Sequence, residues 1–172
     1  MKPHRKTMAV FLDLSATFDR VWCQNLVHIY YNTGIKGNAL IWINDFLRDR
    51  KFSVRFNGVL FESHKLRAGV PQGSVLRPLL FLNHMNTIHP HIHPDTKIAC
   101  YADDIAVWHS HIDTAVSQEV ISATLEGIAA WAEDLKLTIK ADKTNYRIFS
   151  TDRRHRSTFS ATIKIRESQI KS

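Results

Sequence analysis

Three short segments of the chain are almost wholly apolar, and each predicts a β-strand. The first, Met8–Leu14, is interrupted only by Asp13 and is typical of a buried central strand that carries a carboxylate near its C-terminal end. The other two, Lys97–Tyr101 and Ile105–Trp108, flank a short turn that contains two aspartates. Two apolar runs around such a turn predict a tight hairpin.

Apolar residues spaced three and four apart predict helices between these strands. Asp19 is expected to cap a helix that runs to Tyr31 and stops at Asn32–Gly34. Three more helices are expected, one after Gly37 with an apolar face, one over residues 78–85 and one over residues 114–135. The apolar face of the second helix is expected to comprise Leu40, Ile41, Ile43, Phe46 and Leu47.

A second hairpin is indicated by Asn57–Gly58, which lies between Phe52–Phe56 and Val59–Ser63. Asn-Gly between segments rich in β-branched and aromatic residues is a strong hairpin signal. Further strands are expected over Lys143–Ser150 and, marginally, over Thr162–Arg166. This order of elements predicts an α+β fold, an antiparallel sheet with helices packed on one face.

Composition narrows the class of protein. The 172 residues are 44% apolar, enough for the core of one domain, and the net charge of +7 suits a polyanionic partner such as nucleic acid. Two cysteines exclude a disulfide framework. No apolar run approaches the roughly 20 residues that span a bilayer, and the start lacks the apolar stretch of a signal peptide. We therefore expect a soluble intracellular protein without a membrane partner, in the nucleus or the cytoplasm.

Three carboxylates are the candidate chemistry. Asp13, Asp103 and Asp104 lie among apolar strand residues, where an anion is costly unless a positive charge neutralises it. Oxygen ligands without Cys or His favour Mg²⁺ or Mn²⁺, and two such ions support phosphoryl transfer. We expect Asp13 and Asp103 to bridge the ions, with Asp104 bound more loosely. The simpler interpretation is a polar hairpin turn and a capped strand end.

Four blocks in this order resemble the reverse transcriptase domain of non-LTR (LINE-like, jockey-type) retrotransposons. The resemblance covers roughly residues 8–150, and the blocks are Ala9–Val21, Leu66–Phe81, Tyr101–Asp104 and Trp131–Thr144. The third block alone is short, whereas the Phe-Leu-Asp-Leu-Ser and Gly-Val-Pro-Gln-Gly-Ser-Val-Leu sequences of the first two are specific.

The resemblance implies roles for individual residues. Asp13, Asp103 and Asp104 resemble the catalytic metal ligands, and Lys143 resembles a lysine that donates a proton to the departing pyrophosphate or neutralises its charge. The resemblance also implies four substrate-binding residues, Phe18, Gln72, Gly73 and Tyr101. Phe18 is expected to exclude a 2′-hydroxyl, and the loop of Gln72 and Gly73 to line the nucleotide pocket. A core phenylalanine and a solvated lysine are the simpler interpretations of Phe18 and Lys143.

The fold implied is a polymerase palm with an RRM- or ferredoxin-like core, over residues 1–150, followed by a basic tail over 151–172. The family's fingers and thumb, and any endonuclease, are expected to be largely missing from this chain. The implied function is RNA-directed DNA synthesis in a mobile element, with an RNA template, a DNA primer, dNTPs and two Mg²⁺ ions, Mn²⁺ being the alternative. An inactive palm remnant that binds RNA, and a two-metal nuclease, are the other hypotheses.

The chain departs from the family pattern at several positions. Arg77 stands where the family has a serine that caps the next helix, which is expected to weaken the start of that helix by ~0.5–2 kcal/mol. Lys140 and Ala141 replace a common Asn-Pro pair. Two other clusters have a simple interpretation as loops: the histidines of residues 89–95, which would bind a metal only if extended, and the basic run Arg153–Arg156.

Overall fold

The structure, a computed structural model, describes residues 5–15, 17–66, 68–71, 73–150, 163–165 and 168–170. The chain divides into two compact units. We call Met1–Ser15 together with Ile88–Ser172 the sheet unit, and Ala16–Thr87 the helical unit. The basic run Arg153–Arg156 lies outside the described residues.

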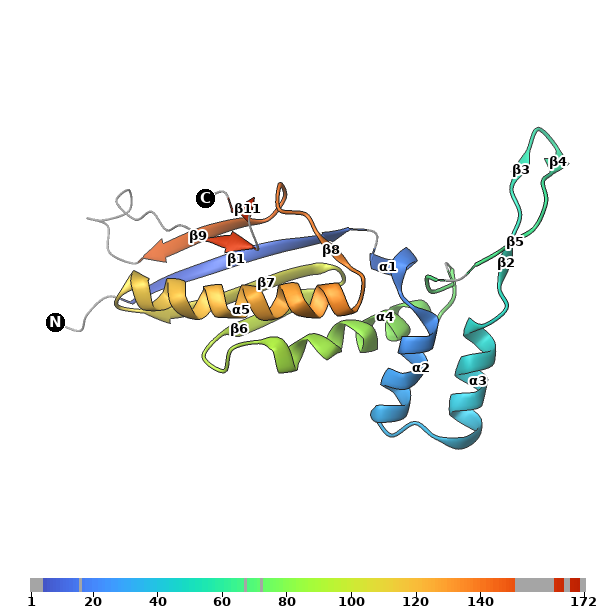
Figure 1. The fold of residues 1–172 in the computed structure, drawn as a ribbon, viewed down its shortest axis with the longest axis horizontal. Helices are drawn as coiled ribbons and strands as arrows, with labels where there is room; N and C mark the ends of the chain where they lie inside the picture. Colours follow the sequence, from blue (N-terminus) through green and yellow to red (C-terminus); the bar gives the residue numbers. More distant parts are fainter. Residues whose placement is uncertain are drawn as a thin grey trace. The chain divides into compact units, whose positions relative to one another are not determined.

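The sheet unit is built on one antiparallel sheet with β1 at its centre (Figure 1). Strand β1 pairs with β7 along one edge, and with β9 and β8 along the other, while β6 pairs with β7 as a hairpin. The strands are β1 (Lys6–Ser15), β6 (Lys97–Tyr101), β7 (Asp104–His111), β8 (Thr138–Ile139) and β9 (Asn145–Ser150). The predicted antiparallel sheet is confirmed.

One long helix, α5 (Thr114–Asp134), packs against the sheet (Figure 1). Alternate residues of β1 point to opposite faces of the sheet, and the even-numbered set Met8, Val10, Leu12 and Leu14 is at most 2% exposed. Helix α5 buries a matching stripe with helical spacing: Ile121, Leu125, Ile128 and Ala132. Asp113 caps its start, because Oδ1 accepts a hydrogen bond from the backbone N–H of Ala115 at 2.9 Å.

The opposite face of the sheet is less covered. It carries the odd-numbered residues of β1, of which Phe11 is 40% exposed. The prediction of a buried central strand therefore holds for one face of β1. Two short strands follow the sheet, β10 (Lys164–Ile165) and β11 (Ser168–Gln169), and β10 packs near α5. Strand β10 lies within the marginal strand expected over Thr162–Arg166, whereas β8 and β11 were not expected.

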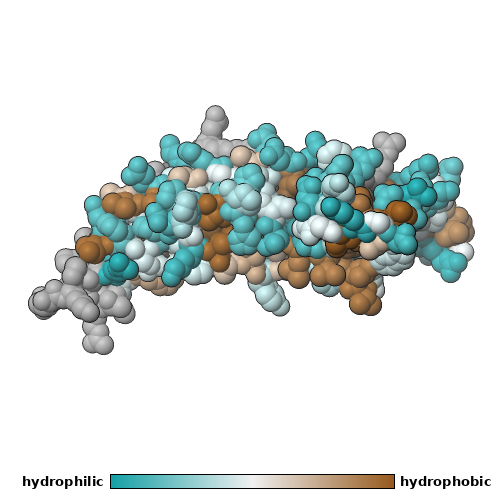
Figure 2. Space-filling model, turned by 90° about the horizontal axis from the view of Figure 1, so that it is seen from below, coloured by the Kyte–Doolittle hydropathy of each residue, from teal (hydrophilic) through white to brown (hydrophobic). Residues whose placement is uncertain are grey.

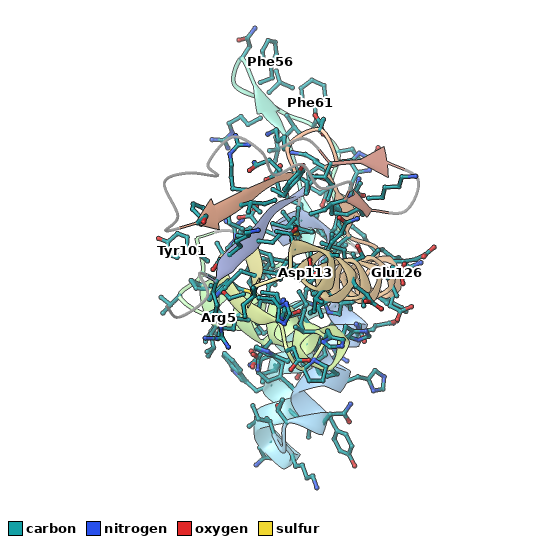
Figure 3. All side chains as sticks on the ribbon, turned by 90° about the vertical axis from the view of Figure 1, so that its left-hand side faces the viewer. Arg5, Phe56, Phe61, Tyr101, Asp113 and Glu126 are labelled. Carbon is teal, nitrogen blue, oxygen red and sulfur yellow. The ribbon has the colours of Figure 1, made fainter. Side chains whose placement is uncertain are left out.

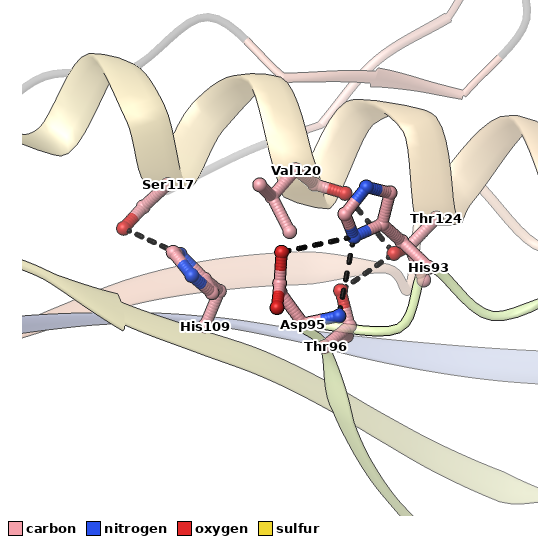
Figure 4. Close-up of polar contacts among 7 residues, drawn as sticks. All are labelled: His93, Asp95, Thr96, His109, Ser117, Val120 and Thr124. Atoms are coloured by element: carbon pink, nitrogen blue, oxygen red, sulfur yellow. Dashed lines mark hydrogen bonds and ion pairs between the residues drawn. The ribbon is translucent and has the colours of Figure 1, made fainter.

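Within the sheet unit, polar side chains of α5 pair with residues of the neighbouring strand and turn (Figure 4). The hydroxyls of Thr96 and Thr124 are 2.7 Å apart, and Thr124 donates to the carbonyl of Val120 at 3.0 Å. Nδ1 of His109 lies 3.0 Å from the hydroxyl of Ser117. Burial, with a further contribution from His111, lowers the pKa of His109. These contacts satisfy hydroxyls that a buried interface would otherwise leave unpaired.

The described part of the helical unit contains four α-helices and two pairs of short strands. The helices are α1 (Thr17–Arg20), α2 (Cys23–Asn32), α3 (Gly37–Leu47) and α4 (Arg77–Met85). A 3₁₀ helix, η1 (Asn86–His91), follows α4 and carries the chain into the residues of the sheet unit. Helix α2 packs against α3 and α4 through buried residues that include Leu26 and Tyr30. Gly34, with φ of +96°, ends α2 where the sequence predicts a stop.

The predicted helix over residues 19–31 is wrong at its start. It is broken at Val21 and Trp22, so that Asp19 lies inside the short helix α1 and Trp22 precedes α2 without a side-chain cap. Val21 is fully buried, and its carbonyl accepts a hydrogen bond from the N–H of Gly69 at 2.8 Å. The bond to a distant loop takes the carbonyl that a continuous helix would use, and periodicity cannot reveal it.

Asn57–Gly58 forms the predicted hairpin, but the strands are short. β3 (Arg55–Phe56) pairs with β4 (Val59–Leu60), and β2 (Lys51–Phe52) pairs with β5 (His64–Lys65) below them. Asn57 and Gly58 both adopt positive φ, +48° and +80°, as the turn requires. Every strand residue is exposed, and Figure 3 shows Phe56 and Phe61 projecting from the hairpin.

Apolar side chains also remain at the surface of α3 and α4. Ile41, Trp42, Leu79 and Leu82 are each more than half exposed, and Figure 2 shows apolar patches over this part of the helical unit. The predicted apolar face of α3 is therefore only partly buried, through Ile43 and Leu47. No helix among the described residues is long and apolar enough to cross a membrane.

Candidate active site

Asp13 and Asp104 lie directly opposite each other at one end of the sheet. The register of β1 and β7 runs from Lys6 opposite His111 to Asp13 opposite Asp104. In the β6–β7 hairpin, Tyr101 pairs with Asp104, so Ala102 and Asp103 form the turn. Residues directly opposite each other in an antiparallel pair point to the same face. The sheet therefore brings together carboxylates that are about ninety residues apart in sequence.

The carboxylate of Asp13 lies beside two ammonium groups. Nζ of Lys140 is 3.5 Å and Nζ of Lys143 is 3.8 Å from Oδ2 of Asp13. Both separations exceed the usual length of an N–H···O hydrogen bond, and this buried oxygen has no hydrogen-bond partner. Oδ2 of Asp13 is thus compensated by nearby charge alone.

The turn after β8 holds these two lysines in place. The N–H of Lys140 donates to the carbonyl of Asp13 at 3.0 Å. The carbonyl of Lys140 in turn accepts from the N–H groups of Lys143 and Thr144, at 3.1 and 2.9 Å, and from the hydroxyl of Thr144 at 2.9 Å. Thr144 is 1% exposed, so the turn is anchored in the core.

A depression of about 390 Å³ lies on the sheet at this end. Its lining includes Asp13, Asp104, Tyr101, Lys143 and Asn145. Tyr101 is 84% exposed, and Figure 3 shows its side chain pointing outward. Carboxylates, a lysine and an exposed ring around one hollow are suited to a charged, phosphate-bearing ligand that is held with cations.

The donor set fits a hard divalent cation, although no group of three or more metal-ligating side chains is gathered in the described residues. Two observations support the fit: Asp13 and Asp104 are opposite each other in the register of β1 and β7, and Oδ2 of Asp13 is buried without a hydrogen-bond partner. Carboxylate oxygens without sulfur or imidazole are the ligands that Mg²⁺ and Mn²⁺ prefer. His93 belongs to the histidine cluster of residues 89–95, which was the other candidate metal site. Its Nδ1 lies 3.9 Å from the carboxylate of Asp95 in the same turn (Figure 4).

Comparison of the chain with known proteins identifies its family. A family model described as "Reverse transcriptase (RNA-dependent DNA polymerase)" matches residues 1–164. The chain belongs to the reverse transcriptase family. A probable RNA-directed DNA polymerase from transposon X-element of Drosophila melanogaster is 31% identical over 156 residues, and that from mobile element jockey of the same fly is 32% identical over 149 residues. The predicted family is confirmed.

This reverse transcriptase chain is much shorter than these relatives. The alignments cover 85% and 83% of the chain but only 16% of each relative. Among solved structures, telomerase from Candida tropicalis in complex with a fragment of telomeric RNA aligns over 95% of this chain and 28% of its own, with a TM-score of 0.64 and 13% identity. Telomerase from Candida albicans gives a TM-score of 0.58 at 14% identity. These likenesses support the predicted palm-like α+β fold.

Phe18, one of the predicted substrate-binding residues, lies in the helical unit. It is half-buried and contacts two side chains of α4. Its ring stacks on that of Phe81 with centroids 3.9 Å apart and an interplanar angle of 26°. The guanidinium of Arg77 lies 4.5 Å from the centre of the Phe18 ring. Phe18 therefore belongs to the packing of this unit, and it also keeps part of its surface accessible.

The glycine-rich loop of the second block is fastened to the segment that carries Phe18. The N–H of Val70 donates to the carbonyl of Phe18 at 3.1 Å, as that of Gly69 does to Val21. Gly69 has φ of +83°, and a Cβ there would lie 3.1 Å from the carbonyl oxygen of Asp19, so only glycine fits without strain. Gly73 is exposed with φ of +79°, whereas Gln72 lies outside the described residues.

Sequence reasoning missed Arg50, which holds the same loop from the base of the hairpin. Its guanidinium donates to the carbonyl of Leu47 at 3.1 Å, to that of Ala68 at 3.3 Å and to that of Gly69. It also contacts Sγ of Cys23 at 3.2 Å. An arginine that binds three carbonyls leaves no periodic or motif signal. Lys140 was noted only as a departure, yet it is the nearer of the two lysines to Asp13.

Proposed function

We propose that this chain carries the catalytic centre of an RNA-directed DNA polymerase of a mobile element. The reaction adds deoxynucleotides from dNTPs to the 3′-hydroxyl of a DNA primer on an RNA template. The observation that carries the proposal is the cross-strand pair of Asp13 and Asp104 at the rim of a hollow, in a chain of the reverse transcriptase family. The relatives, named as polymerases of transposons and mobile elements, supply the substrate class.

Asp13, Asp103 and Asp104 would hold two divalent cations, Mg²⁺ or Mn²⁺. When bound, these ions supply positive charge at the attacking and leaving oxygens of the phosphoryl transfer. The role of Asp13 is supported by its buried oxygen, which lacks a hydrogen-bond partner, and that of Asp104 by its place opposite Asp13. Asp103, in the turn next to Asp104, is proposed as the third carboxylate ligand.

Lys143 is proposed to act on the departing pyrophosphate. Its side chain is 59% exposed and lines the hollow, so the ammonium can turn from Asp13 toward an anion bound there. An ammonium in that position neutralises the charge that develops on the leaving group, and it can donate a proton to it.

The remaining site residues would bind the nucleotide. Phe18 is proposed to lie under the sugar, where its ring offers a 2′-hydroxyl neither room nor a hydrogen bond. Gly73 and Gln72 would line the pocket, where glycine lets the backbone approach the base pair and the amide can hydrogen-bond without charge. Tyr101, exposed beside the carboxylates, would contact the substrate.

Primer extension tests this function directly. The 172-residue chain is incubated with an RNA template, a DNA primer, dNTPs and Mg²⁺, and incorporation is compared with that of Asp13→Asn and Asp104→Asn. Each variant should reduce the rate at least ~10²-fold, as expected for loss of a group that stabilises charge in the transition state. Asp142→Asn, an exposed change in the neighbouring turn, should alter it less than about twofold. Absence of extension, or extension that persists in Asp13→Asn, would exclude the proposal for this chain.

One observation favours the alternative, an RNA-binding module without catalysis. Phe11 and Phe149 are 40% and 54% exposed, and the register places them with exposed Arg147 on the same face of the sheet. Exposed aromatic rings on a sheet with a basic side chain between them are suited to stacking on unpaired bases. Binding of single-stranded RNA that weakens in Phe11→Ala and Phe149→Ala, without primer extension, would identify the chain as such a module.

A further inference from the structure

We propose that Lys140 competes with the divalent cation for the carboxylate of Asp13 and thereby sets the metal concentration that this site requires. The proposal rests on the metal site of the proposed function and assigns a role to a residue outside that site's predicted set. Lys140 is then a positioning residue, because it acts through Asp13.

The first support is the geometry at Asp13. Nζ of Lys140 is 3.5 Å from Oδ2, the oxygen that is buried and lacks a hydrogen-bond partner. An ammonium at this distance neutralises the carboxylate through charge, and it does so without the hydrogen bond that would make the contact rigid. A cation that binds the same oxygen must displace this ammonium or remain close to it.

The second support is the difference between the two lysines. The backbone of Lys140 is hydrogen-bonded to Asp13 itself, and the Lys140 side chain is 36% exposed. The side chain of Lys143 is 59% exposed and its backbone does not pair with β1. Lys143 can leave Asp13 for solvent or for a bound anion, whereas Lys140 starts from a backbone fixed beside the carboxylate. The persistent positive charge at Asp13 therefore comes from Lys140.

The third support is the expected effect of the Lys140 charge on a divalent cation bound at Asp13. A unit positive charge within a few ångströms of a carboxylate attracts it, and the same charge repels a divalent cation twice as strongly as it would a monovalent one. The site is partly open, so solvent screens both effects. We expect removal of the Lys140 charge to tighten binding of a divalent cation about tenfold.

Metal binding by the 172-residue chain tests this without any need for polymerase activity. Mn²⁺ is titrated into the protein, and free Mn²⁺ is followed by its electron paramagnetic resonance signal. Lys140→Gln should lower the apparent Kd about tenfold, and Lys140→Arg, which keeps the charge, should leave it within about twofold. Lys136→Gln removes one charge from the same stretch of chain at an exposed position and should also change it less than twofold.

Asp13→Asn locates the site, because binding that depends on Asp13 is lost in this variant. An unchanged or higher Kd in Lys140→Gln, with Asp13-dependent binding in the parent chain, overturns the role of Lys140 and leaves the metal site standing. Binding in Lys140→Gln but not in the parent supports the proposal in its strongest form. If neither the parent chain nor any Lys140 variant binds Mn²⁺ in a manner that depends on Asp13, both the metal site and the competition by Lys140 are excluded. Thermal unfolding of each variant verifies that it is folded.

Discussion

The guanidinium of Arg77 lies over the ring of Phe18, 4.5 Å from its centre, while Phe81 stacks on that ring at 3.9 Å. Arg77 and Phe81 are four residues apart on α4 and therefore share one face of the helix. The departure at residue 77 thus has a structural use. Arg77 is the first residue of α4 rather than its cap, which is Leu76, and Ser74 accepts a hydrogen bond from the N–H of Leu76 at 3.1 Å.

This contact predicts an energetic coupling between Phe18 and Arg77. A guanidinium over an aromatic face contributes about 0.5–1 kcal/mol where it is partly exposed. In a double-mutant cycle with Phe18→Leu and Arg77→Met, measured by urea unfolding, the two changes should couple by that amount. Combining Phe18→Leu with Lys36→Met, a change at the exposed residue that precedes α3, should give additive effects. A coupling near zero in the first cycle would mean that the two groups pack without attraction.

The proposed position of Phe18 predicts an effect on sugar selection. Phe18→Val shortens the side chain and opens space where a 2′-hydroxyl would lie, so the ratio of dNTP to rNTP incorporation should fall by up to ~10²-fold, the usual limit for rejecting an added hydroxyl by shape. Steady-state primer extension with each nucleotide measures the ratio. Phe56→Val, at an exposed position of β3, serves as the control and should leave it unchanged. Equal ratios in the parent and in Phe18→Val would assign Phe18 to the core alone.

The hydroxyl pair under α5 predicts a rescue by double substitution. Thr96 and Thr124 are 8% and 0% exposed, and their hydroxyls are 2.7 Å apart. Thr96→Val leaves Thr124 with only its bond to Val120, and Thr124→Val leaves the Thr96 hydroxyl without this partner, so each should destabilise the fold by ~1–2 kcal/mol. The double variant should lose clearly less than the sum, because the Thr96 hydroxyl that Thr124→Val leaves without this partner is then absent. Urea unfolding provides the four values, and strict additivity would contradict the pairing.

Replacing Gly127 with alanine is predicted to destabilise the fold, the opposite of the usual effect of this substitution in a helix. Alanine for glycine inside a helix normally stabilises by about 1 kcal/mol. Here a Cβ would lie 2.1 Å from the carbonyl oxygen of His91, a backbone atom of η1. Gly127→Ala should therefore destabilise by about 1–3 kcal/mol. Glu126→Ala, at the exposed neighbouring position, should have little effect on the midpoint of thermal unfolding. A stabilised Gly127→Ala would show that η1 moves away at little cost.

His84 predicts loss of stability at acid pH. It is fully buried, neither ring nitrogen has a hydrogen-bond partner, and burial lowers its pKa from 6.5 to about 4. Between these values the unfolded chain binds a proton that the folded chain does not, so the free energy of unfolding falls as pH drops from 6.5 toward 4, by about 3 kcal/mol in total. Above pH 6.5 this contribution is fully present.

His84→Met replaces the titrating imidazole with an unbranched, flexible apolar side chain. Its free energy of unfolding should therefore vary less between pH 7 and pH 4 than that of the parent, by the same ~3 kcal/mol. His28→Met, at an exposed position of α2, should follow the parent. Urea unfolding at a series of pH values gives both slopes, and parallel curves for the parent and His84→Met would contradict the assignment.

Periodicity and turn chemistry predicted the larger elements well. Helix α5 and strands β1, β6, β7 and β9 lie within a few residues of their expected bounds, since each is long or has a clear alternation. The break at Val21, the short strand β8 and the exposed face of α3 were not predicted. Each depends on a hydrogen bond or a neighbour from a distant part of the chain, as the bond between Val21 and Gly69 illustrates.

For the site, the sequence by itself determined the membership of the family and the residue types of its chemistry, because motif blocks and apolar strands that end in aspartate are local features. Only the tertiary structure decided that Asp104 is the residue opposite Asp13, since the register of β1 and β7 is set by packing against α5 and not by either strand alone. The same holds for Lys140, whose charge reaches Asp13 through a turn that joins β1 from 127 residues away in the chain. Contacts between residues that are far apart in the chain contribute to the stability of the fold, and the local pattern of apolar and polar residues does not reveal them.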